Sequence, residues 1–158
     1  MKRFGKIALC LGLSLGMFTT IDSSNFTIEA KAKKPYQIGQ TVKVKGMKIT
    51  VNGIRDVGVT PLESPEDGKM FLAVDCTIEN DTSNDVTSSS IMWYSVKGDD
   101  GRKCDQIISA ELNGSLDTDI ASGEVVAGEV CYEVPTEGSL YLTFKPTFST
   151  KSARIQIR

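Results

Sequence analysis

The sequence predicts an all-β protein folded as an antiparallel β-sandwich of seven or eight strands. Beyond residue 40, apolar and polar residues alternate through most of the 158-residue chain, with the period of half-buried strands. Glycine, proline, asparagine and aspartate gather between the alternating segments, as they do in turns. No window long enough for an ordinary helix keeps a helical period, so we expect two packed sheets and little helix.

The alternation predicts strands along the whole second part of the chain. The clearest lies at 71–78, where every second residue is apolar and faces the predicted core. Asn52-Gly53 interrupts an earlier strand and predicts a bulge or a turn. The predicted strands are 42–44, 47–57, 71–78, 91–96, 104–108, 125–134, 140–144 and 153–157.

Three connections stand out between these strands. Residues 58–69 contain two prolines and an Asp-Gly pair and predict an exposed loop. Residues 98–101 end in Asp-Gly and predict a tight hairpin turn. Residues 109–124 carry three large aliphatic residues at near-helical spacing and are not assigned to an element.

The first 32 residues predict export. A basic start precedes a stretch of about 12 apolar residues, too short to span a bilayer. Ala30-Lys31-Ala32 then matches the site that signal peptidase cleaves, so Lys33 becomes the new N-terminus. The alternative is an uncleaved anchor. We expect residues 33–38 to form an extended lead-in and 39–158 to form the sandwich domain.

The mature chain carries a mild negative charge. Removal of the signal leaves 14 basic and 18 acidic residues, a formal charge of −4. Nucleic acid and anionic lipid repel such a surface, so we expect no nucleic-acid partner and no stable membrane insertion after cleavage. A chain of 126 residues is also long enough to bury one core without a metal.

The chain contains no histidine. This composition excludes Ser-His-Asp and Cys-His nucleophile arrangements and removes the commonest zinc ligand. We therefore predict no enzymatic activity and no cofactor. A hydrolase that uses Ser/Lys or paired carboxylates is the alternative from the enzyme class.

Four segments resemble a known family in their strand and turn patterns: 39–42, 71–80, 94–103 and 122–135. Together they are similar to an immunoglobulin-like family of unknown function, found in secreted and lipid-anchored proteins of Gram-positive bacteria. Its architecture is similar to that of the mycobacterial immunoprotective extracellular antigen. The resemblance covers residues 38–158 and implies an immunoglobulin-like sandwich. It implies no catalytic residues.

Two features depart from that family's pattern. Many members carry a lipid-anchor motif, but Leu9 before Cys10 fits it poorly. The chain also has cysteine at positions 76, 104 and 131, where the resemblance implies apolar or aromatic residues.

The three mature cysteines allow one intramolecular disulfide at most. Cys76 shares the core face of its strand, and a three-residue hairpin loop would place Cys104 facing inward as well. Cys131 alternates out of phase with its apolar neighbours and should point outward. We favour a Cys76–Cys104 bridge, with the other two pairings and three free thiols left open.

Trp93 is the candidate surface contact. Adjacent residues of a regular strand face opposite sides, so either Trp93 or Tyr94 should point away from the core. An outward aromatic ring could contact a carbohydrate or a protein. The alternative is that the segment 109–121 covers it.

Several aspartates invite a calcium hypothesis, but their spacing does not match a calcium-binding loop, and turn geometry explains them better. These residues are Asp99, Asp100, Asp105, Asp117 and Asp119. The sequence therefore predicts no metal site.

The function that fits these observations is a secreted, non-enzymatic interaction module of the extracellular space or cell surface, with cell-wall association open. Its partner would be an unknown protein or cell-envelope component, bound through loops at one end or through an exposed edge strand. A small-ligand or metal-binding envelope protein is the main alternative.

Overall fold

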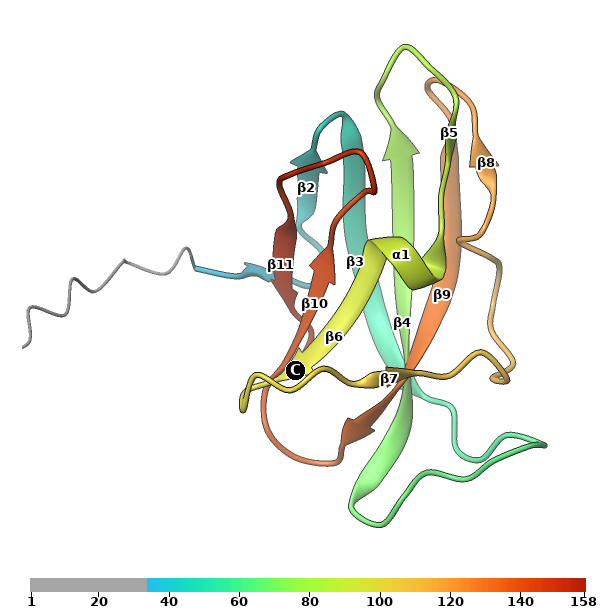
Figure 1. Cartoon of the computed structure of the whole chain (residues 1–158), viewed down its shortest axis with the longest axis vertical. Helices are drawn as coiled ribbons and strands as arrows, with labels where there is room; N and C mark the ends of the chain where they lie inside the picture. The colour runs from blue at the N-terminus through green and yellow to red at the C-terminus, as the bar shows by residue number, and fades with distance from the viewer. Residues whose placement is uncertain (1–33) are drawn as a thin grey trace, which may run out of the picture. The chain divides into compact units, whose positions relative to one another are not determined.

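Strands from distant parts of the chain pair into two sheets that pack face to face (Figure 1). The computed structural model describes residues 34–158. Sheet A contains, in spatial order, β1 (Tyr36–Gln37), β11 (Ala153–Gln156), β10 (Leu140–Phe144) and β6 (Tyr94–Gly98). Sheet B contains β2 (Thr41–Val44), β3 (Met47–Asp56), β4 (Lys69–Asn80), β9 (Val125–Pro135) and β7 (Asp105–Gln106). The remaining elements are a small ladder of β5 (Val86–Thr87) with β8 (Asp119–Ile120), and the helical turn α1 (Ser90–Trp93).

The strand pairing confirms the predicted antiparallel sandwich, with one exception. The ladders among described residues are antiparallel except that between β1 and β11, which run parallel. Nine strands of the described chain belong to the two sheets, slightly more than expected. The extra ones are short, because β1 and β7 contribute two residues each.

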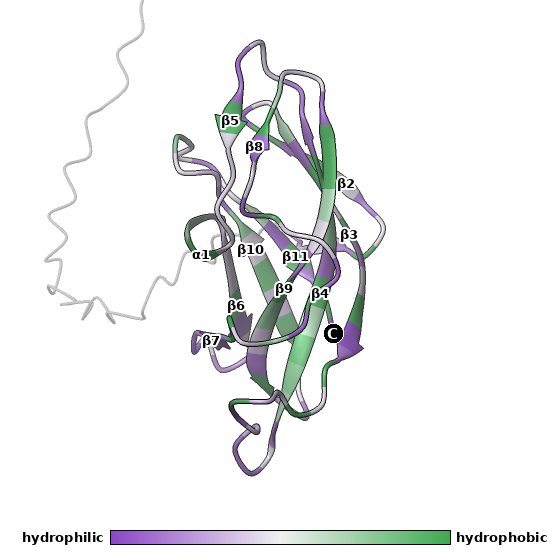
Figure 2. Ribbon diagram, turned by 90° about the vertical axis from the view of Figure 1, so that its right-hand side faces the viewer, coloured by the Kyte–Doolittle hydropathy of each residue, from purple (hydrophilic) through white to green (hydrophobic). Residues whose placement is uncertain are grey.

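The core lies between the sheets. Inward residues of the long strands are fully buried, as Val74, Cys76 and Ile78 are on β4. The ribbon in Figure 2 shows hydrophobic and hydrophilic residues alternating along these strands. Burial of each large aliphatic side chain contributes about 1.5–3 kcal/mol, which explains why the alternation predicts the strands well.

Asn52 forms the predicted bulge. The pairing of β3 with β4 skips one residue between Val51 and Gly53. The extra residue turns its side chain outward, where Asn52 Nδ2 donates to Asp75 Oδ1 at 3.1 Å and to Thr77 Oγ1 at 2.9 Å. Beyond the bulge, the outward face of β3 is occupied by Arg55.

The structure corrects the prediction for residues 91–96. Residues 90–93 form one helical turn instead of a strand, because Ser89 caps it: the Ser89 side chain accepts from Met92 N–H, and its carbonyl accepts from Trp93 N–H at 3.0 Å. The strand begins only at Tyr94. A helical turn does not alternate faces, so Trp93 and Tyr94 are both buried.

The chain crosses from sheet A to sheet B after the hairpin at 98–101. Cys104 N–H still bonds to Val96 O at 2.9 Å, but β7 pairs with β9 on the other sheet. The predicted strand 104–108 therefore shortens to two residues. The unassigned segment that follows forms no helix, and β8 is its single strand. Leu116 and Ile120 anchor the segment in the core.

The predicted signal segment 1–32 and Cys10 lie outside the described residues.

Candidate interaction site

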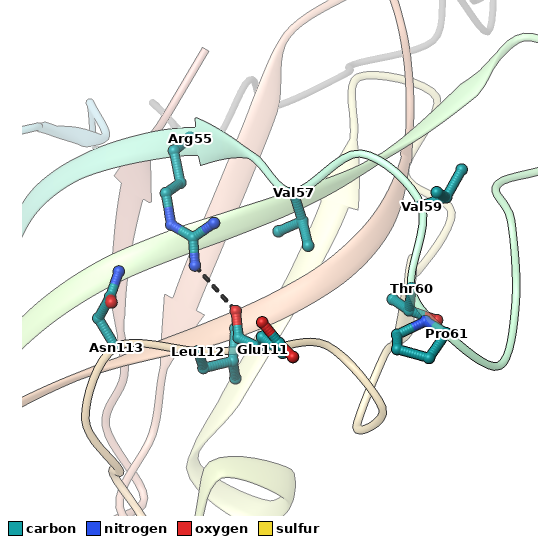
Figure 3. A pocket seen from close by; sticks show the side chains of 8 residues that line it. All are labelled: Arg55, Val57, Val59, Thr60, Pro61, Glu111, Leu112 and Asn113. Atoms are coloured by element: carbon teal, nitrogen blue, oxygen red, sulfur yellow. Dashed lines mark hydrogen bonds between the residues drawn. The ribbon is translucent and has the colours of Figure 1, made fainter.

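Two loops meet at one end of the sandwich and enclose a pocket. The 57–68 loop joins β3 to β4, and the 107–118 loop joins β7 to β8. They touch through hydroxyl groups, since Thr60 Oγ1 lies 3.5 Å from Ser109 Oγ and Ser109 Oγ donates to Glu63. The pocket between them has a volume of about 770 Å³ (Figure 3). Its lining residues are Arg55, Val57, Val59, Thr60, Pro61, Glu111, Leu112 and Asn113.

An ion pair on the outer face of sheet B forms one wall of this pocket. Arg55 at the end of β3 donates from Nε to Glu129 Oε1 at 2.9 Å and from Nη2 to Glu129 Oε2 at 2.7 Å. The Glu129 side chain is 5% exposed, whereas that of Arg55 is 40% exposed. This two-point geometry fixes the plane of the guanidinium group.

Asn113 completes the set of donors around the buried carboxylate. Its backbone N–H donates to Glu129 Oε2 at 2.8 Å, and its Nδ2 donates to Oε1 at 3.2 Å. The hydrogen bonds from Arg55, and to a lesser extent those from Asn113, together lower the pKa of Glu129 to about 2 against the raising effect of burial. Glu129 is therefore ionised at neutral pH and ties the 107–118 loop to the sheet.

The same arrangement leaves a donor group aimed at no protein atom. Arg55 Nη2 also donates to the Glu111 carbonyl at 3.0 Å, the contact dashed in Figure 3. Among the described residues, no hydrogen-bond partner faces Arg55 Nη1. The pocket thus offers two N–H groups, held in place by the ion pair, to an acceptor on a ligand.

A small apolar cluster lies between the two loops and the outer face of sheet B. Phe71, Ile107 and Cys131 are buried together on the outer face of sheet B, and Val57 and Leu112 pack against them. The loop lies very close to β9 nearby, because a Cβ placed on Gly128 would come within 2.8 Å of the Ser115 backbone. This packing holds the pocket walls in position.

The two loops that meet at the pocket expose three large aliphatic side chains, of which Val59 also lines the pocket. Val59 is 69% exposed, Leu62 83% and Ile108 80%. Isolated exposed apolar residues are ordinary, but three on two loops joined by side-chain contacts are unusual outside a binding surface. We call Val59, Leu62 and Ile108 the end patch.

The prediction that Trp93 is a surface contact is wrong. Its side chain is 2% exposed, its ring packs edge-on against Phe144 and Phe148, and Nε1 donates to Thr147 Oγ1 at 2.8 Å. The segment between β10 and β11 therefore contacts the ring through Thr147 and Phe148. Next to it, Met92 is exposed instead.

The three cysteines are free and buried in the structure. Cys76 and Cys104 both belong to the main core, as predicted, yet no disulfide joins them there. Cys131 points away from the main core, but the 107–118 loop covers it and burial raises its pKa to about 11. The Cys76–Cys104 bridge stays a prediction for the protein after export to an oxidising compartment.

Four of the five aspartates of the calcium hypothesis accept hydrogen bonds from protein donors. Asp99 accepts from Ser139 N–H, Asp100 from Arg102 N–H, Asp117 from Ser90 N–H and Asp119 from the Thr87 hydroxyl. Over residues 34–158, no three histidine, cysteine or carboxylate side chains group as metal ligands would.

Sequence reasoning missed the whole pocket. Arg55 and Glu129 are 74 positions apart and come together only through the pairing of β3, β4 and β9. One signal was present: Cys131 is an apolar residue at an outward position of a strand, which indicates that something covers that face.

Comparisons with known proteins agree with this fold. The chain is 29% identical over 134 residues to the uncharacterized protein YxkC of Bacillus subtilis, covering 77% of this chain and 74% of that protein. The crystal structure of the Bacillus subtilis yjhA protein superposes with a TM-score of 0.62 at 16% identity, covering 78% of this chain and 99% of that one. The crystal structure of MPT63, a secreted protein from Mycobacterium tuberculosis, superposes with a TM-score of 0.56 at 12% identity and covers 78% of this chain and 96% of MPT63.

These likenesses confirm the immunoglobulin-like sandwich and the predicted resemblance to a mycobacterial secreted protein. Within residues 34–158, no helix is long and apolar enough to cross a bilayer. The family model for a domain of unknown function, DUF4352, matches residues 36–155, which is nearly all of the described chain. The protein therefore belongs to the DUF4352 family.

Proposed function

We propose that this protein is an exported, non-enzymatic interaction module that binds a protein partner through the end patch and the adjoining pocket. The observation that carries the proposal is the exposure of three large aliphatic side chains on the two loops that meet at a pocket, one wall of which is fixed by the ion pair of Arg55 with the buried Glu129. Preorganised loops lose little conformational freedom on binding, which favours affinity.

Export is supported by the signal-like first 32 residues and by the fold shared with a secreted protein. An extracellular or cell-surface module also fits the use of loops on a rigid sandwich as a contact surface.

The chemistry of the pocket supports binding over catalysis. Glu129 is ionised and accepts four hydrogen bonds, so it is poorly suited to act as a general acid or base. The open, exposed rim favours a macromolecular partner over a small ligand, which a deep enclosed cavity would suit better.

Site-specific photo-crosslinking in the producing cell tests this proposal. Benzoylphenylalanine is introduced in place of Leu62 or, as a matched control, in place of Val125, an equally apolar residue that is 57% exposed at the start of β9. We expect a discrete protein adduct from position 62 that Ile108→Ser removes, and none from position 125. Adducts from both positions alike, or from neither, would contradict the proposal.

A further inference from the structure

We propose that the occupant of the end patch is a polypeptide segment in which an apolar side chain is flanked by lysine or arginine. This inference rests on the function proposed above and names the chemistry of the partner. It follows from the charges around the patch, the free donor in the pocket and the apolar pocket walls.

The two loops that carry the patch are acidic throughout. Residues 57–68 and 107–118 contain five carboxylates and no lysine or arginine. The residues are Glu63, Glu66, Asp67, Glu111 and Asp117.

The cations that flank the 57–68 loop in sequence, Arg55 and Lys69, are already paired with carboxylates. Glu129 pairs with Arg55, while Lys69 lies 2.6 Å from Glu66 and 3.0 Å from Glu133. Of the acidic groups, Glu111 lines the pocket and Glu63 holds Ser109 beside it. A partner that places cations around its apolar contact therefore gains attraction from both, and an acidic partner is repelled.

The interior of the pocket suits a peptide in particular. Arg55 Nη1 offers donors to a backbone carbonyl, and Val57, Pro61 and Leu112 supply apolar walls for one side chain. A polypeptide presents a carbonyl, an apolar side chain and neighbouring cationic side chains within a few residues of one another. The acidic loops disfavour an anionic membrane as the occupant, and they disfavour a second copy of the chain, whose own end is equally acidic.

Peptide selection tests the inference directly. A random heptapeptide library displayed on phage is selected against the exported protein, and the enriched peptides are synthesised for binding measurements. We expect enriched sequences that combine an apolar residue with lysine or arginine, and we expect their affinity to fall as salt is raised. The double variant Glu63→Gln/Glu111→Gln should bind them about three- to tenfold more weakly. Glu124→Gln should leave affinity unchanged, because the exposed Glu124 bonds through its carbonyl to Asn80 N–H, at the opposite end of β4 from the 57–68 loop.

The outcomes separate the two proposals. If Leu62→Ser and Ile108→Ser abolish binding but the double charge variant does not weaken it, the charge inference is wrong and the proposed function stands. Enrichment of acidic or uncharged peptides, or of none, also overturns the inference. If peptides bind and neither patch variant affects them, the proposed site itself is wrong. Sedimentation that shows self-association removed by Leu62→Ser would identify a second copy as the occupant and overturn the inference.

Discussion

Replacement of Glu129 by glutamine should destabilise the protein at neutral pH and much less in acid. The carboxylate of Glu129 accepts two hydrogen bonds from Arg55 and two from Asn113, and its side chain is 5% exposed. Glutamine keeps the shape but removes the charge, and it turns an amide donor toward groups that are donors themselves.

The size of the effect follows from the pKa of Glu129. Hydrogen bonding to Arg55 is the main cause that lowers it from 4.5 to about 2. One pKa unit corresponds to about 1.4 kcal/mol, so ionisation of Glu129 contributes about 3 kcal/mol to the free energy of unfolding. Because the folded-state pKa is the lower one, this contribution is complete above pH 4.5 and declines as the pH falls toward 2.

Urea unfolding of the protein and of Glu129→Gln, at pH 7 and at pH 2.5, measures the difference. We expect a loss of about 3 kcal/mol at pH 7 that shrinks to under about 1 kcal/mol at pH 2.5. Glu137→Gln, an exposed carboxylate in the β9–β10 turn, serves as the control and should change stability by less than about 0.5 kcal/mol at either pH. A difference for Glu129→Gln that is equal at both pH values would refute the reasoning.

Three further predictions concern packing and burial. Gly128→Ala should lower the free energy of unfolding by about 2 kcal/mol in urea titrations, because the added methyl group meets the Ser115 backbone. The control Gly53→Ala places its methyl group where no atom lies within 4 Å and should lower it by less than about 0.5 kcal/mol. Equal losses from the two variants would contradict the steric argument. Iodide should quench the fluorescence of Trp93, the one tryptophan of the chain, far less in the native protein than in urea, and equal quenching would show that the ring is exposed. Cys131, whose pKa is raised to about 11, should resist iodoacetamide at pH 8 until the protein is unfolded; peptide mapping that finds it alkylated in the native state would show that the 107–118 loop opens.

The alternation of apolar and polar residues predicts the sandwich because a core between two sheets requires apolar side chains on one face of each strand. Every second residue of a strand must face either the opposite sheet or the solvent, so β4 and β9 are readable from their sequences alone. The same logic failed at Trp93, where the Ser89 cap starts a helical turn and breaks the alternation. A local hydrogen bond had more influence there than the hydrophobic pattern.

The candidate site could not be predicted in this way. Its central contact joins Arg55 to Glu129, and that pair depends on the register of three strands and on a loop with no periodic pattern. Surface exposure of Leu62 was foreseen only in the sense that a proline-containing loop is exposed. Sequence patterns show which side of a strand is buried, whereas a site formed by loops depends on which loops the fold brings together in space.

The parallel pairing of β1 with β11 has a mechanical consequence. Tyr36 pairs with Ile155 and Gln37 with Gln156, so the chain enters and leaves the fold through neighbouring strands that run the same way. Tension between the segment before β1 and the residues after β11 would slide these strands past each other along their length. The backbone hydrogen bonds between β1 and β11 would then be stretched together and break together. In an antiparallel pair pulled apart from one end, the hydrogen bonds break one after another. A protein held on its N-terminal side and pulled from the residues after β11 would therefore resist this tension first at the β1–β11 pair.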